Sequence, residues 1–309
     1  MKTKLLASSL VAATLIFSGC GESTGSDRLA AQQALDKGDY AASIAALESK
    51  TNKSNEDYMI LASAYMGKAG FSFTDTMSLL GDATATSSSN SFKAFSTSVN
   101  TTLQSNPDAL TNLQKAIDNY TNAGGINAAP SYQAASFVPA QNNTIGDKDL
   151  FLGMAYLTQA TAALSYLGDI TTLQNGTLSE EFVASACAIT HVYASTLVTG
   201  CTNATVTGTT VTLTVNGNSY NRLTNANATQ VYLTNYNLNP LEPILVNGNA
   251  VTIESILVTA INNAFTAITR FAPTDTQDDI TKFKNEIGVV NGQVTAATIA
   301  AYIAIVAAV

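Results

Sequence analysis

Three cysteines and one histidine are the main candidate nucleophiles and metal ligands in this 309-residue chain. Cys20 lies near the N-terminus, whereas Cys187 and Cys201 lie in the second half with His191 between them. A thiol pair at this spacing supports either a disulfide that closes a short loop or two buried free thiols. Two thiols and one imidazole supply at most three metal ligands, and their spacing matches no zinc template, so we expect no metal site.

The other polar residues form no recognisable catalytic set. Ser-His-Asp catalysis would have to use His191, which has no acidic neighbour in the sequence. Glu180 and Glu181 are adjacent, so on a helix their carboxylates point in different directions. The sequence contains no nucleophile elbow, phosphate loop, dinucleotide fingerprint or zinc-protease motif. We therefore expect a protein that is not an enzyme and that needs no cofactor.

The first twenty residues are typical of a secretory signal. Two lysines precede an apolar run that ends at Phe17, and this run is too short to span a bilayer. Two small residues, Ser18 and Gly19, come directly before Cys20. Phe17-Ser18-Gly19-Cys20 resembles the lipobox of bacterial lipoproteins, with Phe17 where most lipoboxes carry leucine.

The resemblance implies that the signal peptide, residues 1–19, is removed and that Cys20 carries a diacylglyceryl group and an acylated amine. Acyl chains contribute about 0.8 kcal/mol for each buried methylene, so three of them would form a stable anchor. Inner-membrane lipoproteins typically carry aspartate after the cysteine, whereas this chain has Gly21, which favours the outer membrane and a periplasm-facing protein. An ordinary signal peptide with a chance cysteine and a buried N-terminal helix are the alternatives.

Composition limits the partners that the chain can bind. The net charge is −8, only 12% of residues are charged, and removal of residues 1–19 with their two lysines would make the net charge about −10. Sparse basic residues argue against nucleic acid and against a polybasic membrane surface. An oxidising periplasm would favour a Cys187–Cys201 disulfide, worth about 3 kcal/mol for a loop of this length.

Helical periodicity dominates the first part of the predicted mature chain. Residues 34–44 include Gly38-Asp39-Tyr40 and resemble the turn between the two helices of a tetratricopeptide repeat. Residues 61–65 resemble the first helix of the next repeat. The resemblance implies a mainly α fold built as an array of helical hairpins, and a generic helical hairpin is the alternative.

We divide the mature chain into a lipidated polar tether over 20–27, a tetratricopeptide-like helical region over 28–125 and a helical region over 126–309. The last two regions could form one continuous domain. A strongly apolar helix is expected from Asp147, and the apolar residues 296–309 are expected to form a terminal packing helix, with partner docking as the alternative.

A small β-hairpin insertion is expected near 205–236. Val211, Leu213 and Val215 alternate with polar residues, and Asn216-Gly217 is a strong hairpin-turn signal. The insertion is either a decorated loop or a recognition hairpin.

Tyrosine is the residue type that could mark recognition, because the chain has 12 tyrosines and no tryptophan. Tyr120 and Tyr132 are our candidates for a partner-binding groove. The leading hypothesis is a membrane-anchored, non-enzymatic binding or scaffold module for a protein partner in an envelope assembly, secretion or transport system. The alternative is a periplasmic small-molecule-binding component associated with a transporter, with a small apolar or organic-acid ligand in an enclosed cavity.

Overall fold

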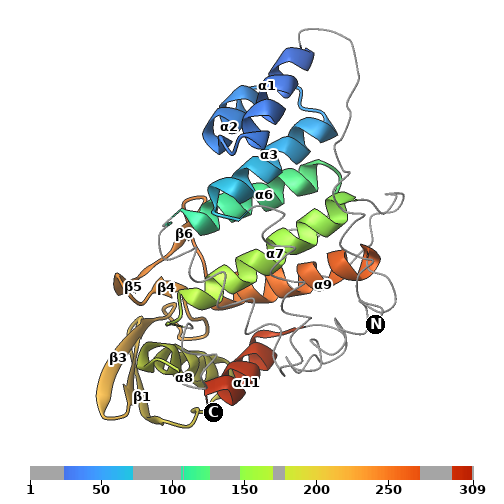
Figure 1. The fold of residues 1–309 in the computed structure, drawn as a ribbon. Coiled ribbons are helices and arrows are strands. Elements are labelled where there is room, and N and C mark those ends of the chain that lie inside the picture. The colour runs from blue at the N-terminus through green and yellow to red at the C-terminus, as the bar shows by residue number, and fades with distance from the viewer. Residues whose placement is uncertain are drawn as a thin grey trace, which may run out of the picture.

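The computed structural model describes residues 24–71, 106, 108–125, 147–169, 178–271 and 294–307. These residues form a mainly α protein with small antiparallel sheets, which confirms that part of the predicted fold class (Figure 1). The helices are α1 (Thr24–Asp36), α2 (Tyr40–Glu48), α3 (Asn55–Lys68), α6 (Ala109–Asn122), α7 (Asp147–Ser165), α8 (Glu180–Ala194), α9 (Thr259–Phe271) and α11 (Ala296–Ala307), with a π-helical turn, η2 (Glu254–Val258), before α9.

Helices α1, α2, α3, α6, α7 and α9 form a stack in which each helix packs against the next one (Figure 1). Helix α7 lies between α6 and α9, so its side chains from residue 152 to residue 165 are all buried. This position accounts for the absence of charge in α7 after Asp149, because a helix covered on both sides has no face on which charges are hydrated.

The turn between α1 and α2 explains the Gly38-Asp39-Tyr40 sequence. Gly38 has φ +74°, a left-handed conformation that favours glycine and ends α1. The Asp39 carboxylate then accepts a hydrogen bond of 3.0 Å from the Ala42 N–H and caps α2. Tyr40 lies against Gly67 on α3, where a Cβ atom would collide with the tyrosine ring. The three residues therefore end one helix, start the next and fill the gap to the third.

A buried carboxylate joins the first three helices. Asp57 on α3 is fully buried and pairs with Arg28 of α1 at 2.9 Å and with Lys50, which follows α2, at 2.6 Å. Its carboxylate also accepts a hydrogen bond from the Ser54 N–H in a capping box. Helix α1 begins at Thr24 rather than at Arg28, so residues 24–27 of the predicted tether are helical.

Seven short strands lie between α8 and η2. They are β1 (Cys201–Thr207), β2 (Thr210–Val215), β3 (Asn218–Leu223), β4 (Thr234–Asn235), β5 (Asn239–Pro243), β6 (Leu245–Val246) and β7 (Asn249–Ala250). The predicted insertion near 205–236 was therefore too short, because strands continue to Ala250. Strands β1, β2 and β3 form one antiparallel sheet in that order, while β4 pairs with β5 and β6 pairs with β7.

The three-stranded sheet packs against α8, as the alternating pattern of β2 requires. Val211, Leu213 and Val215 have no exposed surface, and the Asn216-Gly217 turn between β2 and β3 has φ values of +48° and +86°. Both observations confirm the predicted hairpin. Helix α11 packs against α8, and among the described helices none is both long and apolar enough to cross a membrane.

Candidate interaction surface

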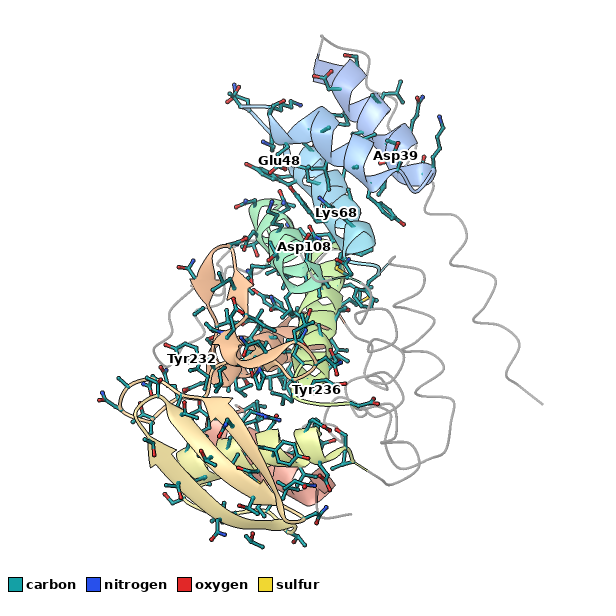
Figure 2. The ribbon with its side chains drawn as sticks, turned by 90° about the vertical axis from the view of Figure 1, so that its left-hand side faces the viewer. Asp39, Glu48, Lys68, Asp108, Tyr232 and Tyr236 are labelled. Atoms are coloured by element: carbon teal, nitrogen blue, oxygen red, sulfur yellow. A yellow bond between two sulfur atoms is a disulfide. The ribbon has the colours of Figure 1, made fainter. Side chains whose placement is uncertain are left out.

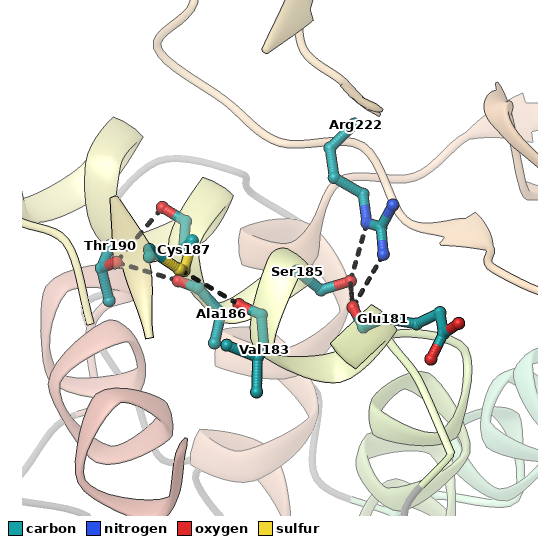
Figure 3. The surroundings of a disulfide bond; sticks show 8 residues. Glu181, Val183, Ser185, Ala186, Cys187, Thr190 and Arg222 are labelled. Atoms are coloured by element: carbon teal, nitrogen blue, oxygen red, sulfur yellow. Dashed lines mark hydrogen bonds between the residues drawn. A yellow bond between two sulfur atoms is a disulfide. The ribbon is translucent and has the colours of Figure 1, made fainter. Parts of the chain in front are cut away.

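The predicted disulfide is present and joins α8 to the sheet. Cys187 on α8 and Cys201 at the start of β1 are bonded, with their Cα atoms 6.5 Å apart (Figure 3). Beside them Arg222 of β3 is only 4% exposed and donates hydrogen bonds to Ser185 Oγ at 2.9 Å and to the Glu181 carbonyl at 2.7 Å. Burial lowers the pKa of Arg222 to about 10. These contacts hold the sheet on α8.

The first acidic residue of α8 also has a structural role. The Glu180 carboxylate accepts hydrogen bonds from Tyr220, Asn218 and Asn216, which together lower the pKa of Glu180. His191 lies half-buried further along α8. In the part of the chain that the structure describes, no three His, Cys, Asp or Glu side chains gather as they would around a metal ion.

Of the two tyrosines predicted to line a groove, only Tyr120 lies in the described residues, and it is buried. Tyr120 is 1% exposed, stacks on Phe151 with 5.8 Å between ring centroids and shares a hydrogen bond of 3.2 Å with Ser63. Burial raises the pKa of Tyr120 to about 12. The prediction that Tyr120 lines a groove was therefore wrong, because residues of α3 and α7 cover its side chain. Tyr132, like Cys20, lies outside the described residues.

Exposed leucines gather on the segment after β4. Six large apolar side chains are clearly exposed in the described residues, and three of them lie within eight consecutive positions. Leu238, Leu241 and Leu245 are 79%, 44% and 54% exposed. We call residues 238–245, which include β5 and the first residue of β6, the leucine segment. Exposed apolar side chains that gather in this way are typical of contact surfaces, whereas isolated ones need no explanation.

Hydrogen bonds and buried neighbours hold the leucine segment in place. The Leu241 N–H donates to Asn239 Oδ1 at 3.0 Å, and the Ile244 N–H donates to the Leu233 carbonyl at 2.8 Å. Val246, directly after the segment, is only 6% exposed. The backbone of the leucine segment is thus held by hydrogen bonds and by a buried neighbour, while the leucine side chains are exposed. A contact surface that is ordered before binding loses less conformational entropy when a partner arrives.

The sequence around the leucine segment is almost free of charge. Glu242 is the only Asp, Glu, Lys or Arg in residues 223–253. Tyr232 and Tyr236 belong to the same stretch, which lies between the three-stranded sheet and the helical stack (Figure 2). Protein–protein interface cores are depleted in charge and enriched in aromatic residues. Full burial of the three leucines would contribute about 3–5 kcal/mol before the costs of association.

No known protein family, curated protein or solved structure matches this chain. The leucine segment was absent from our sequence-based candidates, although a signal was present. Asn247-Gly248 is the same turn dipeptide as Asn216-Gly217, and it has φ values of +50° and +78°. This second Asn-Gly turn indicates that the β region extends past Tyr236.

Proposed function

We propose that this chain is a lipoprotein of the bacterial outer membrane that faces the periplasm and acts as a non-enzymatic binding or scaffold module. Its anchor is the lipid on Cys20, and its helical stack is a tetratricopeptide-like array. The leucine segment is the surface that contacts a protein partner in an envelope assembly, secretion or transport system. The observation that carries this proposal is the group of three exposed leucines on an ordered backbone, in a stretch of sequence (223–253) with one charged residue.

The anchor is tested separately from the binding surface. Cells that express the full chain are grown with radiolabelled palmitate, and the labelled protein is followed through membrane fractionation. The wild-type chain incorporates label and stays with the outer membrane. The Cys20→Ala variant loses both properties. Equal labelling of the two chains would refute lipidation at Cys20 without bearing on the leucine segment.

The binding surface is tested by photo-crosslinking in intact cells. A photoreactive residue at Glu242, which is exposed, samples the neighbourhood of the leucine segment, and one at the exposed Gln33 on α1 is the matched control. We expect a single discrete adduct from position 242 that disappears when all three leucines are replaced by serine. Circular dichroism checks that the serine variant keeps its helices. An adduct that survives the serine replacements, or that forms equally from position 33, would contradict the proposal.

A further inference from the structure

Strand β1 is one of the two edge strands of the three-stranded sheet, and its outer side has no strand partner in the described residues. The strand order is β1-β2-β3, and only one side of β1 is paired, with β2. Five of the seven residues of β1 are exposed. Helix α8 covers part of the inner face of the sheet, but Val206 on β1 remains 40% exposed. An unpaired edge offers a row of N–H and C=O groups to another strand.

The register of the hairpin shows which groups point outward. Thr207 and Thr210 flank a two-residue turn, so they exchange backbone hydrogen bonds with each other. Every second residue along β1 bonds to its partner on β2 in the same way. Asn203 and Thr205 therefore bond to β2, because they lie opposite Thr214 and Thr212. The pairing of β2 with β3 gives the same result. Val215 and Asn218 flank the turn between these two strands and bond to each other, so the alternate residues Thr212 and Thr214 of β2 bond to β1.

Two residues of β1 are consequently left with outward-facing backbone groups. These are Ala204 and Val206, which lie opposite Leu213 and Val211 on the apolar face of the sheet. Their backbone groups point to the free edge, and their side chains share the face that packs on α8. A strand that is added here would extend both the hydrogen-bond ladder and the apolar surface.

We propose that this edge pairs with the β1 strand of a second copy of the chain, antiparallel, about a two-fold axis at Thr205. Ala204 then lies opposite Val206 of the second copy, and each of these residues uses its outward N–H and C=O. The two Ala204–Val206 pairs would form about four ladder hydrogen bonds. Thr205 meets Thr205 of the second copy on the outer face, and paired threonines are favourable across strands.

Charge favours a second copy as the occupant. Residues 182–221 contain no Asp, Glu, Lys or Arg, although the whole chain has a net charge of −8. Two copies can therefore approach along β1 without placing carboxylates opposite one another. Proteins usually protect such edges with lysine, proline or a bulge. Strand β1 contains neither residue, and its one irregularity lies between Cys201 and Asn203, away from the proposed axis.

A single strand pair is smaller than a standard interface of about 1,600 Å². We therefore expect weak association in solution and stronger association where chains are confined to one surface. Only this concentration effect rests on the proposed lipid anchor. The edge geometry is the same with or without it, so both the full chain in membranes and the purified Cys20→Ala chain are tested.

The test is a register-specific disulfide trap. In the proposed ladder Thr205 faces its own copy in a non-hydrogen-bonded pair, where Cα atoms approach to about 4.5 Å, a distance that a disulfide can bridge. Under mild oxidation Thr205→Cys should form a covalent homodimer. The Asn203→Cys control lies on the same strand face, but its two copies would be about 13 Å apart, so it should dimerise at least tenfold less. A mixture of Asn203→Cys and Thr207→Cys chains should form heterodimers, because these positions face each other.

A disruptive variant completes the experiment. Val206→Lys introduces a charge at the exposed edge and should reduce the Thr205→Cys dimer at least tenfold, with an unchanged circular dichroism spectrum. Mass spectrometry of the dimer checks that Cys187–Cys201 is intact and that both subunits are this chain. Equal dimer yields from positions 203 and 205, or an adduct with a different protein in place of the homodimer, would overturn the proposal. So would a dimer yield that Val206→Lys does not change.

Discussion

The Asp57→Asn variant removes a buried carboxylate that links α1, the end of α2 and α3. Burial by itself raises the pKa of Asp57, but hydrogen bonds from Arg28 and Lys50 and from the Ser54 N–H outweigh it and lower the pKa from 3.8 to about 2. Asparagine keeps the shape of the side chain but loses its charge, so Lys50 and Arg28 both lose the carboxylate that they share, and Arg28 keeps only its longer pair with Glu56 at 4.0 Å. The change therefore isolates the electrostatic part of this junction.

The magnitude follows from the difference in pKa between the folded and the unfolded chain. A fall from 3.8 to about 2 corresponds to about 2.4 kcal/mol at neutral pH, at roughly 1.4 kcal/mol per pH unit. Because the folded-state pKa lies below the unfolded one, this stabilisation is present above about pH 4 and is lost as the pH falls through about 2. We expect Asp57→Asn to lower the free energy of unfolding by about 2 kcal/mol at pH 7.

The assay is urea denaturation followed by far-ultraviolet circular dichroism at several pH values between 7 and 2. The difference between wild type and Asp57→Asn should shrink steadily below pH 4. Asp36→Asn is the matched control, because Asp36 is an exposed carboxylate whose side chain accepts a hydrogen bond from Gln32 in the same helix. It should cost less than about 0.5 kcal/mol. A difference for Asp57→Asn that stays constant over the whole pH range would refute the electrostatic explanation.

Three further predictions concern the disulfide between α8 and the sheet, the close approach of Gly168 to α8, and the core of the stack. Cys201→Ser should lower the free energy of unfolding by about 3 kcal/mol, and a reducing agent should destabilise the wild type in urea denaturation but not this variant. Gly168→Ala would place a Cβ atom against the backbone of α8, so Tm should fall by several degrees, whereas Gly25→Ala has open space and should not lower Tm. Tyr120→Phe should cost about 1 kcal/mol through the lost bond to Ser63, and a double-mutant cycle with Ser63→Ala should show coupling between the two residues.

The elements that the sequence predicted well are those with a local physical signature. Alternation along β2 together with the Asn216-Gly217 turn determines the hairpin, because both act within a few residues. Gly38-Asp39-Tyr40 likewise determines the first helical turn through a left-handed cap and a side-chain cap. Such signals need no knowledge of the tertiary structure, so they can be read from one sequence.

The candidate site depended on tertiary contacts, and there the sequence was a poor guide. Tyr120 continues an apolar helical stripe, which is compatible with either a core or a groove, and only the packing of α3 and α7 shows that it is core. The leucine segment shows the opposite case. Pro240 and Pro243 remove backbone donors and obscure a strand pattern, while asparagine side chains supply hydrogen bonds that no periodicity indicates.

The two proposed surfaces lie at different places relative to the proposed anchor. Helix α1 begins four residues after Cys20, a stretch of chain that reaches about 14 Å at most, so a lipidated Cys20 would hold this end of the stack close to the membrane. The β1–β3 sheet lies at the other end of the described chain, with the leucine segment between them (Figure 1). A dimer through β1 therefore leaves the leucine segment accessible in both copies. Covalent Thr205→Cys dimers should still form the adduct from position 242, and loss of that adduct on dimerisation would show that the two surfaces overlap.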